Sequence, residues 1–357
     1  MSDALDAGWI GMGPLTQQFE AQIGSYLGNA ARHVVSTNSG TAALHLAALS
    51  AGLGPGDEVI CPSFTYVAGH QAMTQTGADV VFCDIEETTL GVDPASMRSM
   101  ISERTKALMA VHYAGIVCRI DEIYELAAEH DLRVIEDAAH AFGSSHNGRL
   151  IGSFGDYVCF SYGPVKIITT LEGGAVVTGD ASEVQPLHEL RLIGVDNDTA
   201  ARYARGRAWE YDVTRQGYRY HLGSIPAAIG ISQLAMIDTF ITNRQGYCRR
   251  YNEALGDLDE IRTPTTDFND VSPFIYFIRV ADGETRADLM AHMKSRGVAT
   301  GIHFQGAHEF TFYKDCRSSD LSVTELMAQQ QLTIPLHSFM DDQTLDRVVD
   351  AIRSFFV

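Results

Sequence analysis

Residues 157–180 of the chain read YVCFSYGPVKIITTLEGGAVVTGD. Two apolar runs, from Tyr157 to Phe160 and from Ala175 to Val177, predict short buried strands joined by a polar loop with glycines. The loop contains Lys166, one of only four lysines in a chain with 22 arginines. A lysine among apolar neighbours and glycines is costly to desolvate, so its pKa should fall, as suits a Schiff-base lysine. A loop lysine that extends its amine into solvent would give the same local pattern.

The overall composition predicts an ordinary globular protein with two domains. The chain has 357 residues, of which 45% are hydrophobic and 20% charged, and this length is more than one simple domain needs. The net charge of −19 argues against binding to nucleic acid or to an anionic membrane surface. No apolar run approaches the ~18 residues of a membrane span, and the N-terminus lacks the pattern of a signal peptide.

The six cysteines are scattered and form no C-x-x-C pair. This spacing indicates neither a zinc site nor a disulfide framework, and we expect no metal. Reduced thiols and a cytoplasmic location are the simplest interpretation.

The order of apolar runs predicts an α/β fold. Strands are expected at residues 33–36, 58–61, 79–84, 106–112 and 132–136, and helices at 14–24, 42–50, 94–101 and 121–130. Alternation of this kind favours a mostly parallel sheet flanked by helices. A long helical pattern runs from 224 to about 258, and a smaller α+β unit follows with a strand at 274–280 and helices at 284–297 and 345–356. We predict a large domain at 10–235 and a small one at 236–357.

Polar residues gather where the predicted parallel strands end. Asp137, Ser161, the Gly40-Thr41 turn and the turn from Phe64 to Tyr66 all follow strands, and ligands of such sheets bind beyond the carboxyl ends. Gly40-Thr41 opens a helix whose free N–H groups could bind a phosphate, although a serine or threonine at this position is usually an N-cap alone. An ionised Asp137 in a shielded crevice needs a cationic partner, such as a pyridinium nitrogen.

These residues belong to motifs through which the chain resembles the DegT/DnrJ/EryC1/StrS sugar aminotransferases, enzymes that use pyridoxal phosphate (PLP). The resemblance runs from about Trp9 to the C-terminus. The matching motifs are Asn38-Ser-Gly-Thr-Ala-Ala-Leu44, Gly54-Pro-Gly-Asp-Glu-Val-Ile60, Pro62-Ser-Phe-Thr-Tyr-Val-Ala68, Glu136-Asp-Ala-Ala-His-Ala141, Gly152-Ser-Phe-Gly-Asp156, Phe160-Ser161 through Lys166, Glu172-Gly-Gly174, Trp209-Glu-Tyr-Asp-Val213 and Gly217-Tyr to Leu222. The resemblance implies PLP fold type I, with a mostly parallel sheet of the seven-stranded type and a smaller C-terminal α+β domain.

The resemblance also implies a role for each site residue. Lys166 would form the Schiff base with PLP, Asp137 would keep the pyridine nitrogen protonated, and His140 would lie near the ring and its O3′. Of the remaining residues, Tyr66 would stack on the ring, and the phosphate would be bound by Gly40, Thr41 and Ser161.

Two further residues are candidates. Arg219 stands where many members have Asn, and it would reach the cofactor phosphate of the partner subunit, which implies a homodimer whose site is completed in trans. An ordinary interface arginine is the alternative. His308 ends the segment 303–308, which lies where the family places substrate-facing residues, although it could equally be a surface or core histidine.

We therefore predict transfer of an amino group from an amino acid, L-glutamate, to a nucleotide-activated keto-sugar, with C4 favoured over C3 by the segment 167–174. Three alternatives remain open. A keto-cyclitol aminotransferase would use the same chemistry. A PLP-dependent sugar dehydratase of this group would have another residue in place of Lys166. A non-catalytic PLP-binding regulator would need a DNA-binding segment or a basic face.

Overall fold

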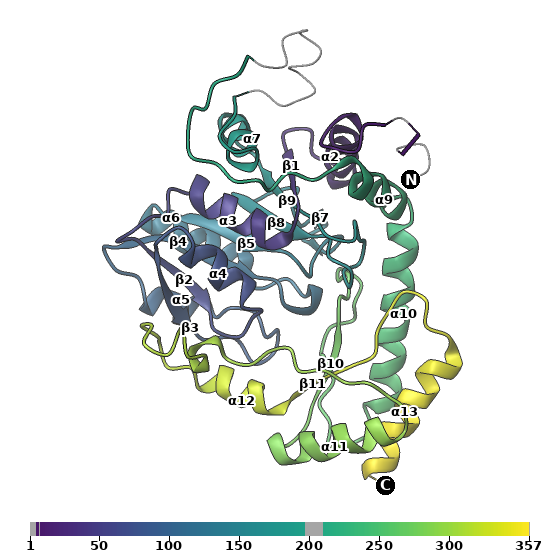
Figure 1. Cartoon of the computed structure of the whole chain (residues 1–357). Helices are drawn as coiled ribbons and strands as arrows, with labels where there is room; N and C mark the ends of the chain where they lie inside the picture. Colours follow the sequence, from purple (N-terminus) through teal and green to yellow (C-terminus); the bar gives the residue numbers. More distant parts are fainter. Residues whose placement is uncertain (1–4, 7, 197–209, 357) are drawn as a thin grey trace.

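The computed structural model describes residues 5–6, 8–196 and 210–356 (Figure 1). Trp209, which opens one of the family motifs, lies outside these residues. The elements up to the predicted lysine loop are α2 (Pro14–Leu27), β1 (His33–Thr37), α3 (Gly40–Ser50), β2 (Glu58–Pro62), α4 (Ala68–Thr74), β3 (Asp79–Cys83), α5 (Pro94–Ser99), β4 (Thr105–Val111), η1 (Tyr113–Gly115), α6 (Ile120–His130), β5 (Arg133–Asp137), β6 (Ser145–His146), β7 (Arg149–Leu150) and β8 (Tyr157–Ser161).

The later elements complete the large sheet and then form a second unit. They are β9 (Gly174–Thr178), η2 (Ala181–Glu183), α7 (Val184–Arg191), α9 (Ser224–Leu234), α10 (Ile237–Leu255), β10 (Tyr276–Arg279), α11 (Gly283–Ser295), η3 (Ala307–Glu309), α12 (Ser322–Gln330), β11 (Gln331–Ile334) and α13 (Asp342–Phe356).

Seven strands form the central sheet, in the order β1-β9-β8-β5-β4-β2-β3. Strands β8, β5, β4, β2 and β3 are parallel neighbours, and β9 runs antiparallel to β8 and β1. In this register Asp137 pairs with Val111 of β4 and with Cys159 of β8. The carboxyl ends of three strands therefore lie side by side, and the mostly parallel sheet predicted from the sequence is confirmed.

Helices cover both faces of this sheet (Figure 1). On one face α3 and α4 bury Leu46 and Met73 against the strands. On the other face α2, α5 and α6 bury Phe19, Met97 and Ile123. Because the strands between them are buried on both sides, they are continuous apolar runs in the sequence, as in residues 107–111.

The C-terminal part has an apolar core of its own, in which α10, α11 and α13 pack against the paired strands β10 and β11. Single bridges from Arg262 to Arg279 and from Gly301 to Thr333 widen this small sheet. The arrangement matches the α+β unit expected from the sequence. The boundary predicted between residues 235 and 236 falls between α9 and α10, and we retain it as a proposal.

The long helical pattern from 224 to 258 is not one helix. The axes of α9 and α10 differ by 60°, and Met236 between them has non-helical backbone angles (φ −109°, ψ 4°). The bend lets α9 lie along α2 while α10 extends to the second unit (Figure 1). Among the described residues no single helix could cross a membrane; α9 and α10 together meet the length and composition required, but only as this bent pair.

Candidate active site

One pocket lies beyond the carboxyl ends of β4, β5 and β8, at the start of α3. Its volume is about 420 Å³. Seven of the nine residues predicted for the site line it: Gly40, Thr41, Tyr66, Asp137, His140, Ser161 and Lys166. The predicted alternation of strands and helices is what brings these distant segments together, because parallel strands end at the same edge.

Lys166 reaches the pocket from the loop between β8 and β9. Its Nζ lies 4.1 Å from the centre of the Phe274 ring. Burial lowers the pKa of Lys166 from its usual 10.5 to about 8, although the Asp137 carboxylate acts in the opposite direction. At pH 7 about one amine in ten is therefore unprotonated, and only that form is a nucleophile.

Asp137 ends β5 with one carboxylate oxygen held and the other facing open space. Oδ1 accepts a hydrogen bond from the Ala139 N–H at 3.1 Å. A methyl group in place of the Gly69 hydrogen would lie 3.6 Å from Oδ2 and 3.0 Å from the Met109 side chain, so the glycine keeps this approach open. On balance the pKa of Asp137 is raised, because burial outweighs the Ala139 N–H, Lys166 and His112, which lower it. The carboxylate is thus placed to bind a cationic group.

A buried acid and base lie directly behind Asp137. The backbone N–H of His112 donates to the Asp137 carbonyl oxygen at 3.2 Å. The side-chain Nε2 of His112 lies 2.9 Å from a Glu136 carboxylate oxygen, and the side chains of His112 and Glu136 are fully buried. Burial lowers the pKa of His112, but its contacts with the Cys118 thiol and Glu136 outweigh this and raise the pKa to about 10. The Tyr124 hydroxyl donates to the other Glu136 oxygen at 2.7 Å.

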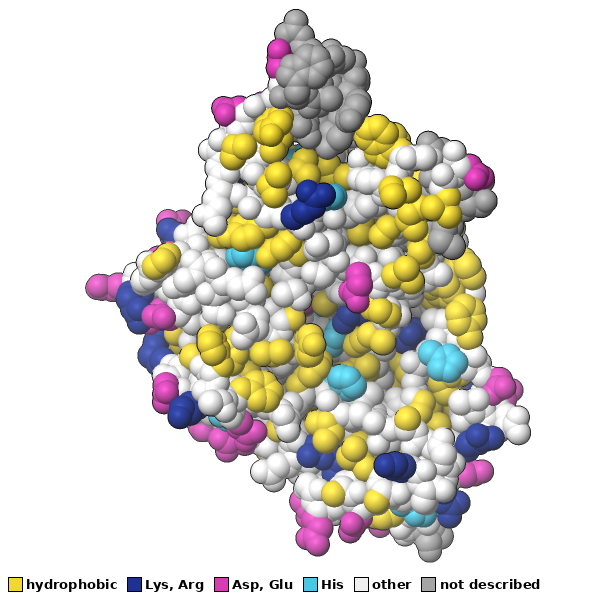
Figure 2. All heavy atoms as spheres, viewed as in Figure 1, with side chains coloured by type: hydrophobic (Ala, Val, Ile, Leu, Met, Phe, Trp, Pro, Cys, Tyr) yellow, Lys and Arg dark blue, Asp and Glu magenta, His cyan; other side chains and the backbone are white. Residues whose placement is uncertain are grey.

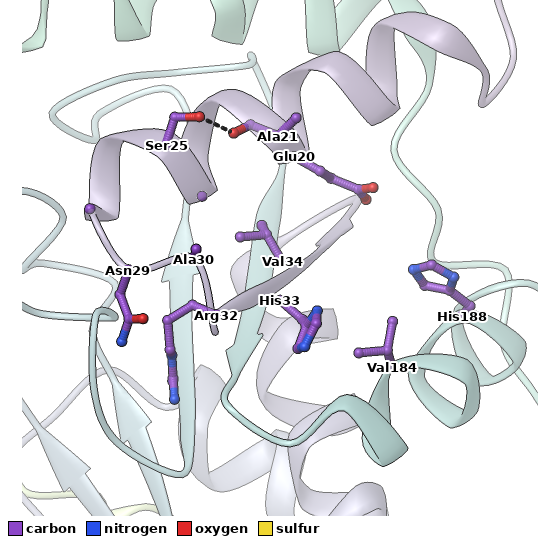
Figure 3. A pocket seen from close by; sticks show the side chains of 12 residues that line it. Glu20, Ala21, Ser25, Asn29, Ala30, Arg32, His33, Val34, Val184 and His188 are labelled. Carbon is purple, nitrogen blue, oxygen red and sulfur yellow. Dashed lines mark hydrogen bonds between the residues drawn. The ribbon is translucent and has the colours of Figure 1, made fainter.

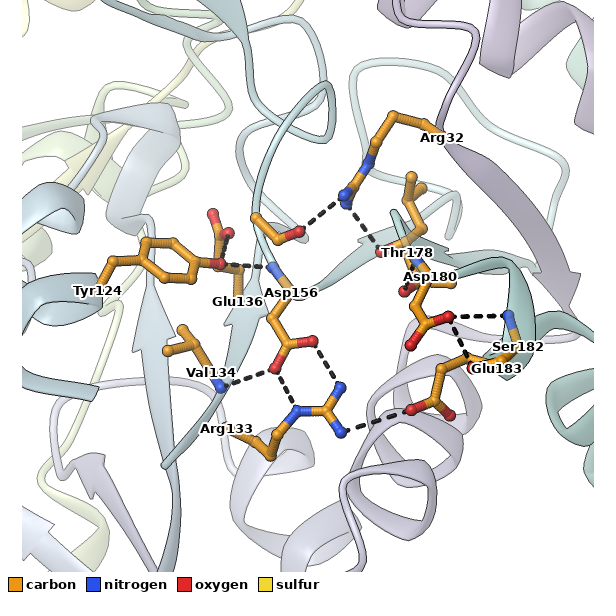
Figure 4. A network of polar contacts seen from close by, with 12 residues as sticks. Arg32, Tyr124, Arg133, Val134, Glu136, Asp156, Thr178, Asp180, Ser182 and Glu183 are labelled. Atoms are coloured by element: carbon orange, nitrogen blue, oxygen red, sulfur yellow. Dashed lines mark hydrogen bonds and ion pairs between the residues drawn. The ribbon is translucent and has the colours of Figure 1, made fainter. Parts of the chain in front are cut away.

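A salt bridge joins β5 and β8 at the ends opposite the pocket (Figure 4). Arg133, the first residue of β5, donates to both oxygens of Asp156 at 2.7 and 2.6 Å. Asp156 immediately precedes β8, and it also accepts from the Val134 N–H at 3.2 Å. The pair therefore ties the amino ends of β5 and β8 together.

The first turn of α3 forms the part of the pocket suited to an anion. The Ser39 hydroxyl caps the helix by accepting from the Ala42 N–H at 3.1 Å, which leaves the N–H groups of Gly40 and Thr41 without an intrahelical partner. A Cβ on Gly40 would lie 2.7 Å from the Ser161 Cβ, so only glycine lets the helix approach Ser161 this closely. The helix dipole adds positive potential at the same place.

Aromatic rings enclose His140, which lies three residues beyond Asp137 in a turn after β5. Its ring stacks on Phe274 with centroids 4.1 Å apart, and Phe304 lies nearly parallel on it at 6.0 Å. Burial, with Lys166 and His303 nearby, lowers the pKa of His140 well below its usual value, which keeps the ring neutral. Its Nδ1 is buried without a hydrogen-bond partner in the structure and is therefore available to a polar atom of a ligand.

Two predicted residues lie outside the pocket lining. The His308 Nδ1 lies 2.8 Å from the Ser63 hydroxyl, and its Nε2 lies 3.7 Å from a Glu325 carboxylate oxygen. Arg219 is exposed, on a segment that forms a single bridge with Leu192. The substrate contact of His308 and the phosphate contact of Arg219 both stay predictions.

The second unit supplies a wall of the pocket that the sequence analysis did not identify. Phe274, His303 and Phe304 form it, and the chain then returns to the large sheet, where the Ala307 N–H donates to the Ser63 carbonyl oxygen at 2.9 Å. The only sequence signal for this wall was the family's substrate-facing segment at 303–308, within which nothing distinguished one histidine from the other.

A second cavity, of about 560 Å³, lies between α2, β1 and α7 (Figure 3). Glu20 is the one carboxylate in its lining, and it pairs with Arg191 and accepts from the Ser36 N–H at 2.8 Å. The residues that line this cavity include no lysine. The pocket around Lys166 is therefore the candidate active site.

The pocket residues fit PLP in the binding mode that the family motifs predict. The start of α3 with Ser161 suits the phosphate, the free Asp137 oxygen suits a protonated pyridine nitrogen, and the Lys166 amine suits the aldehyde. The unpartnered Nδ1 of His140 is a polar atom of the kind that a ring oxygen would satisfy. Among the described residues no group of three or more His, Cys, Asp or Glu side chains could hold a metal ion.

Comparison with known proteins gives consistent matches over the whole chain. Residues 1–353 match the model of the DegT/DnrJ/EryC1/StrS aminotransferase family. The spore coat polysaccharide biosynthesis protein SpsC of Bacillus subtilis (strain 168) is 34% identical over 99% of this chain and 92% of its own length. DesV of S. venezuelae is 32% identical with a TM-score of 0.91, over 99% of this chain and 92% of that one. The PLP form of the putative sugar aminotransferase Spr1654 from Streptococcus pneumoniae is 28% identical with a TM-score of 0.91, over 99% and 94% of the two chains.

Proposed function

Because the chain belongs to the DegT/DnrJ/EryC1/StrS family of PLP-dependent sugar aminotransferases, we propose that it transfers the amino group of L-glutamate to a nucleotide-activated keto-sugar. The observation that carries this proposal is the arrangement around Lys166. A buried amine with a lowered pKa lies in one pocket with the Asp137 carboxylate and the phosphate-binding start of α3.

Each pocket residue then has a definite task. PLP, when bound, supplies an aldehyde for the amino group and a ring that accepts electrons from the donor carbon. Asp137 keeps a positive charge on the pyridine nitrogen, and the start of α3 with Ser161 holds the phosphate. The Lys166 amine would take the proton from the α-carbon of the donor and deliver it to the carbon on the other side of the transferred nitrogen. The neutral His140 fixes the orientation of the ring.

Relatives support a sugar as the acceptor. SpsC is named for polysaccharide biosynthesis and Spr1654 as a putative sugar aminotransferase, and the same class of acceptor is what the motifs of this chain imply. We propose a ketone at C4 rather than C3, on the resemblance of residues 167–174. A keto-cyclitol is the second candidate, because it needs the same chemistry and differs only in its fit to the pocket.

An acceptor screen tests the assignment. The holoenzyme is first converted to its pyridoxamine form with L-glutamate, and the free amino acid is removed. It is then mixed separately with a nucleotide-linked 4-keto-sugar, the 3-keto isomer and a keto-cyclitol, while mass spectrometry follows the gain of nitrogen. The proposal expects rapid amination of the first and slower amination of the other two. Exclusive amination of the cyclitol would overturn it.

We further propose that the functional unit is a homodimer in which Arg219 of one subunit completes the phosphate site of the other. Two large apolar side chains that line the pocket are exposed in the single chain, namely Tyr66 (59%) and Val165 (69%). Figure 2 has the same viewpoint as Figure 1, and it shows hydrophobic side chains gathered across the middle of the visible face. An interface over this face would cover them.

Mixing two inactive variants tests this arrangement. In a hybrid dimer of Lys166→Ala and Arg219→Ala, one of the two sites combines an intact Lys166 with an intact Arg219 only if Arg219 acts in trans. The proposal expects activity to return when the two variants are unfolded and refolded together, but not when each is refolded alone. No recovery in the mixture, or full activity in a demonstrated monomer, would contradict it.

A further inference from the structure

A closed circle of hydrogen bonds holds His303 in the wall of the pocket. The backbone N–H of His303 donates to the Gln331 side-chain oxygen at 3.0 Å. The Gln331 side-chain nitrogen donates to the Thr333 hydroxyl at 2.8 Å, and this hydroxyl lies 2.9 Å from His303 Nδ1. Gln331 is fully buried and Thr333 is 8% exposed, so solvent hardly competes for these bonds.

The circle determines which ring nitrogen of His303 carries the proton. Because a backbone N–H can only donate, the Gln331 amide must present its oxygen to His303 and its nitrogen to Thr333. The Thr333 oxygen therefore receives one hydrogen, and its own hydrogen needs an acceptor, which His303 Nδ1 provides. Nδ1 is then unprotonated, and a neutral ring carries its hydrogen on Nε2.

His303 remains neutral, and its Nε2–H is left for the pocket. Burial lowers the pKa of His303, and so does the positive charge of Lys166. Lys166, His140 and His303 line the same pocket, and Phe304, next to His303 in the chain, stacks on the His140 ring. His303 thus offers an N–H donor in the pocket that contains the Lys166 amine.

The amino donor carries a carboxylate on the same carbon as its amino group, and this carboxylate must enter the pocket. Among the described residues, the pocket lining contains no arginine, and Lys166 is its one lysine. Lys166 must act as a base once the amino group is bound, so it cannot remain the partner of the carboxylate. A buried carboxylate without hydrogen bonds would be costly. The Nε2–H of His303 can supply one.

We propose that His303 binds the α-carboxylate of the amino donor through Nε2–H, and that Thr333 and Gln331 act as positioning residues that hold the ring in this tautomer. The proposal rests on the proposed aminotransferase function and specifies how the donor is recognised. The enzyme would then select its amino-acid substrate through a hydrogen bond from a neutral imidazole, not through an ion pair within the chain.

The first test follows conversion of the holoenzyme to its pyridoxamine form in single turnovers with L-glutamate. His303→Phe keeps an aromatic ring but removes the Nε2–H group that would donate the hydrogen bond. We expect the half-saturating concentration of glutamate to rise at least about tenfold, which is the order expected for a hydrogen bond to a charged group, with the limiting rate changed by less than about threefold. Thr333→Val removes the hydroxyl that sets the tautomer, and we expect it to raise the half-saturating concentration of glutamate about threefold or more. Thr333→Ser keeps the hydroxyl and should retain the wild-type value.

A matched donor separates carboxylate binding from a merely structural effect. 4-Aminobutyrate is glutamate without its α-carboxylate, and we expect His303→Phe to react with it no more slowly than the wild type. Equal losses with both donors would overturn the proposal, because a disordered pocket would affect both. Unchanged glutamate saturation with a slower keto-sugar half-reaction would also overturn it, since His303 would then serve the acceptor.

The protonation state can be measured without any turnover. Long-range ¹H–¹⁵N correlation spectra of histidine-labelled holoenzyme, with the His303 signals identified by their loss in His303→Phe, should show hydrogen on Nε2 at pH 7.5. Hydrogen on Nδ1 would overturn the proposal. If the wild type fails to react with any amino donor, the proposed function fails, and this spectrum still decides the state of His303.

Discussion

Replacing Asp137 with Asn should lower the pKa of Lys166 still further. Burial lowers this pKa to about 8 and the Asp137 carboxylate raises it, so removing the negative charge leaves burial unopposed. With a pKa of about 8, about one amine in ten is unprotonated at pH 7, whereas the usual 10.5 would leave about one in 3,000. Asp137→Asn should therefore bring the pKa of Lys166 below its wild-type value of about 8.

The assay is the rate at which PLP-free protein captures added PLP, followed by visible absorbance in a stopped-flow instrument between pH 6 and pH 10. In the wild type the rate should rise with pH through a midpoint near 8, because only the neutral amine reacts. In Asp137→Asn the midpoint should move to lower pH, even though weaker pairing with the pyridine nitrogen reduces the final occupancy. Lys166→Met serves as the blank. A wild-type midpoint near 10.5, or an upward shift in Asp137→Asn, would refute this reasoning.

Three further substitutions test other parts of the structure. Gly40→Ala places a Cβ 2.7 Å from that of Ser161, and equilibrium titration should show PLP affinity reduced about tenfold or more. Glu136→Gln should lower the free energy of unfolding in urea by about 3 kcal/mol near pH 6. Because the pKa of His112 is raised to about 10, this stabilisation is full below about pH 6.5 and is lost as the pH rises through 10, so the difference between variant and wild type should shrink at high pH. Asp156→Ala should cost about 1 kcal/mol in the same assay, because its partner is partly exposed, and should leave the absorbance of bound PLP unchanged.

Much of the site could be predicted because it follows from the direction of the strands. Asp137 and Ser161 end neighbouring parallel strands, and Gly40 begins a helix directly after another strand of the same sheet. Parallel strands bring their carboxyl ends to one edge, so residues at those positions meet whatever the details of packing. Lys166 was a candidate because it is a lone lysine in an almost uncharged loop, and the family motifs distinguished it from a lysine that extends into solvent.

The remainder of the site depends on contacts between distant segments that no local pattern encodes. The wall formed by Phe274 and His303 comes from the second unit, and its position depends on how that unit packs against the large sheet. His303 and His308 lie five residues apart in one segment, yet His308 is held by Ser63 outside the pocket lining. The bend at Met236 was also missed, because apolar periodicity continues through it.

The central claim is that Lys166 is the residue that binds PLP and moves the proton during transamination. The most direct test is the absorbance spectrum of purified wild type and Lys166→Ala with PLP, before and after L-glutamate is added. We predict a visible band in the wild type that glutamate converts to the pyridoxamine form, and a variant that cannot complete the cycle. A wild type without bound PLP, or a Lys166→Ala variant that cycles as the wild type does, would contradict the claim.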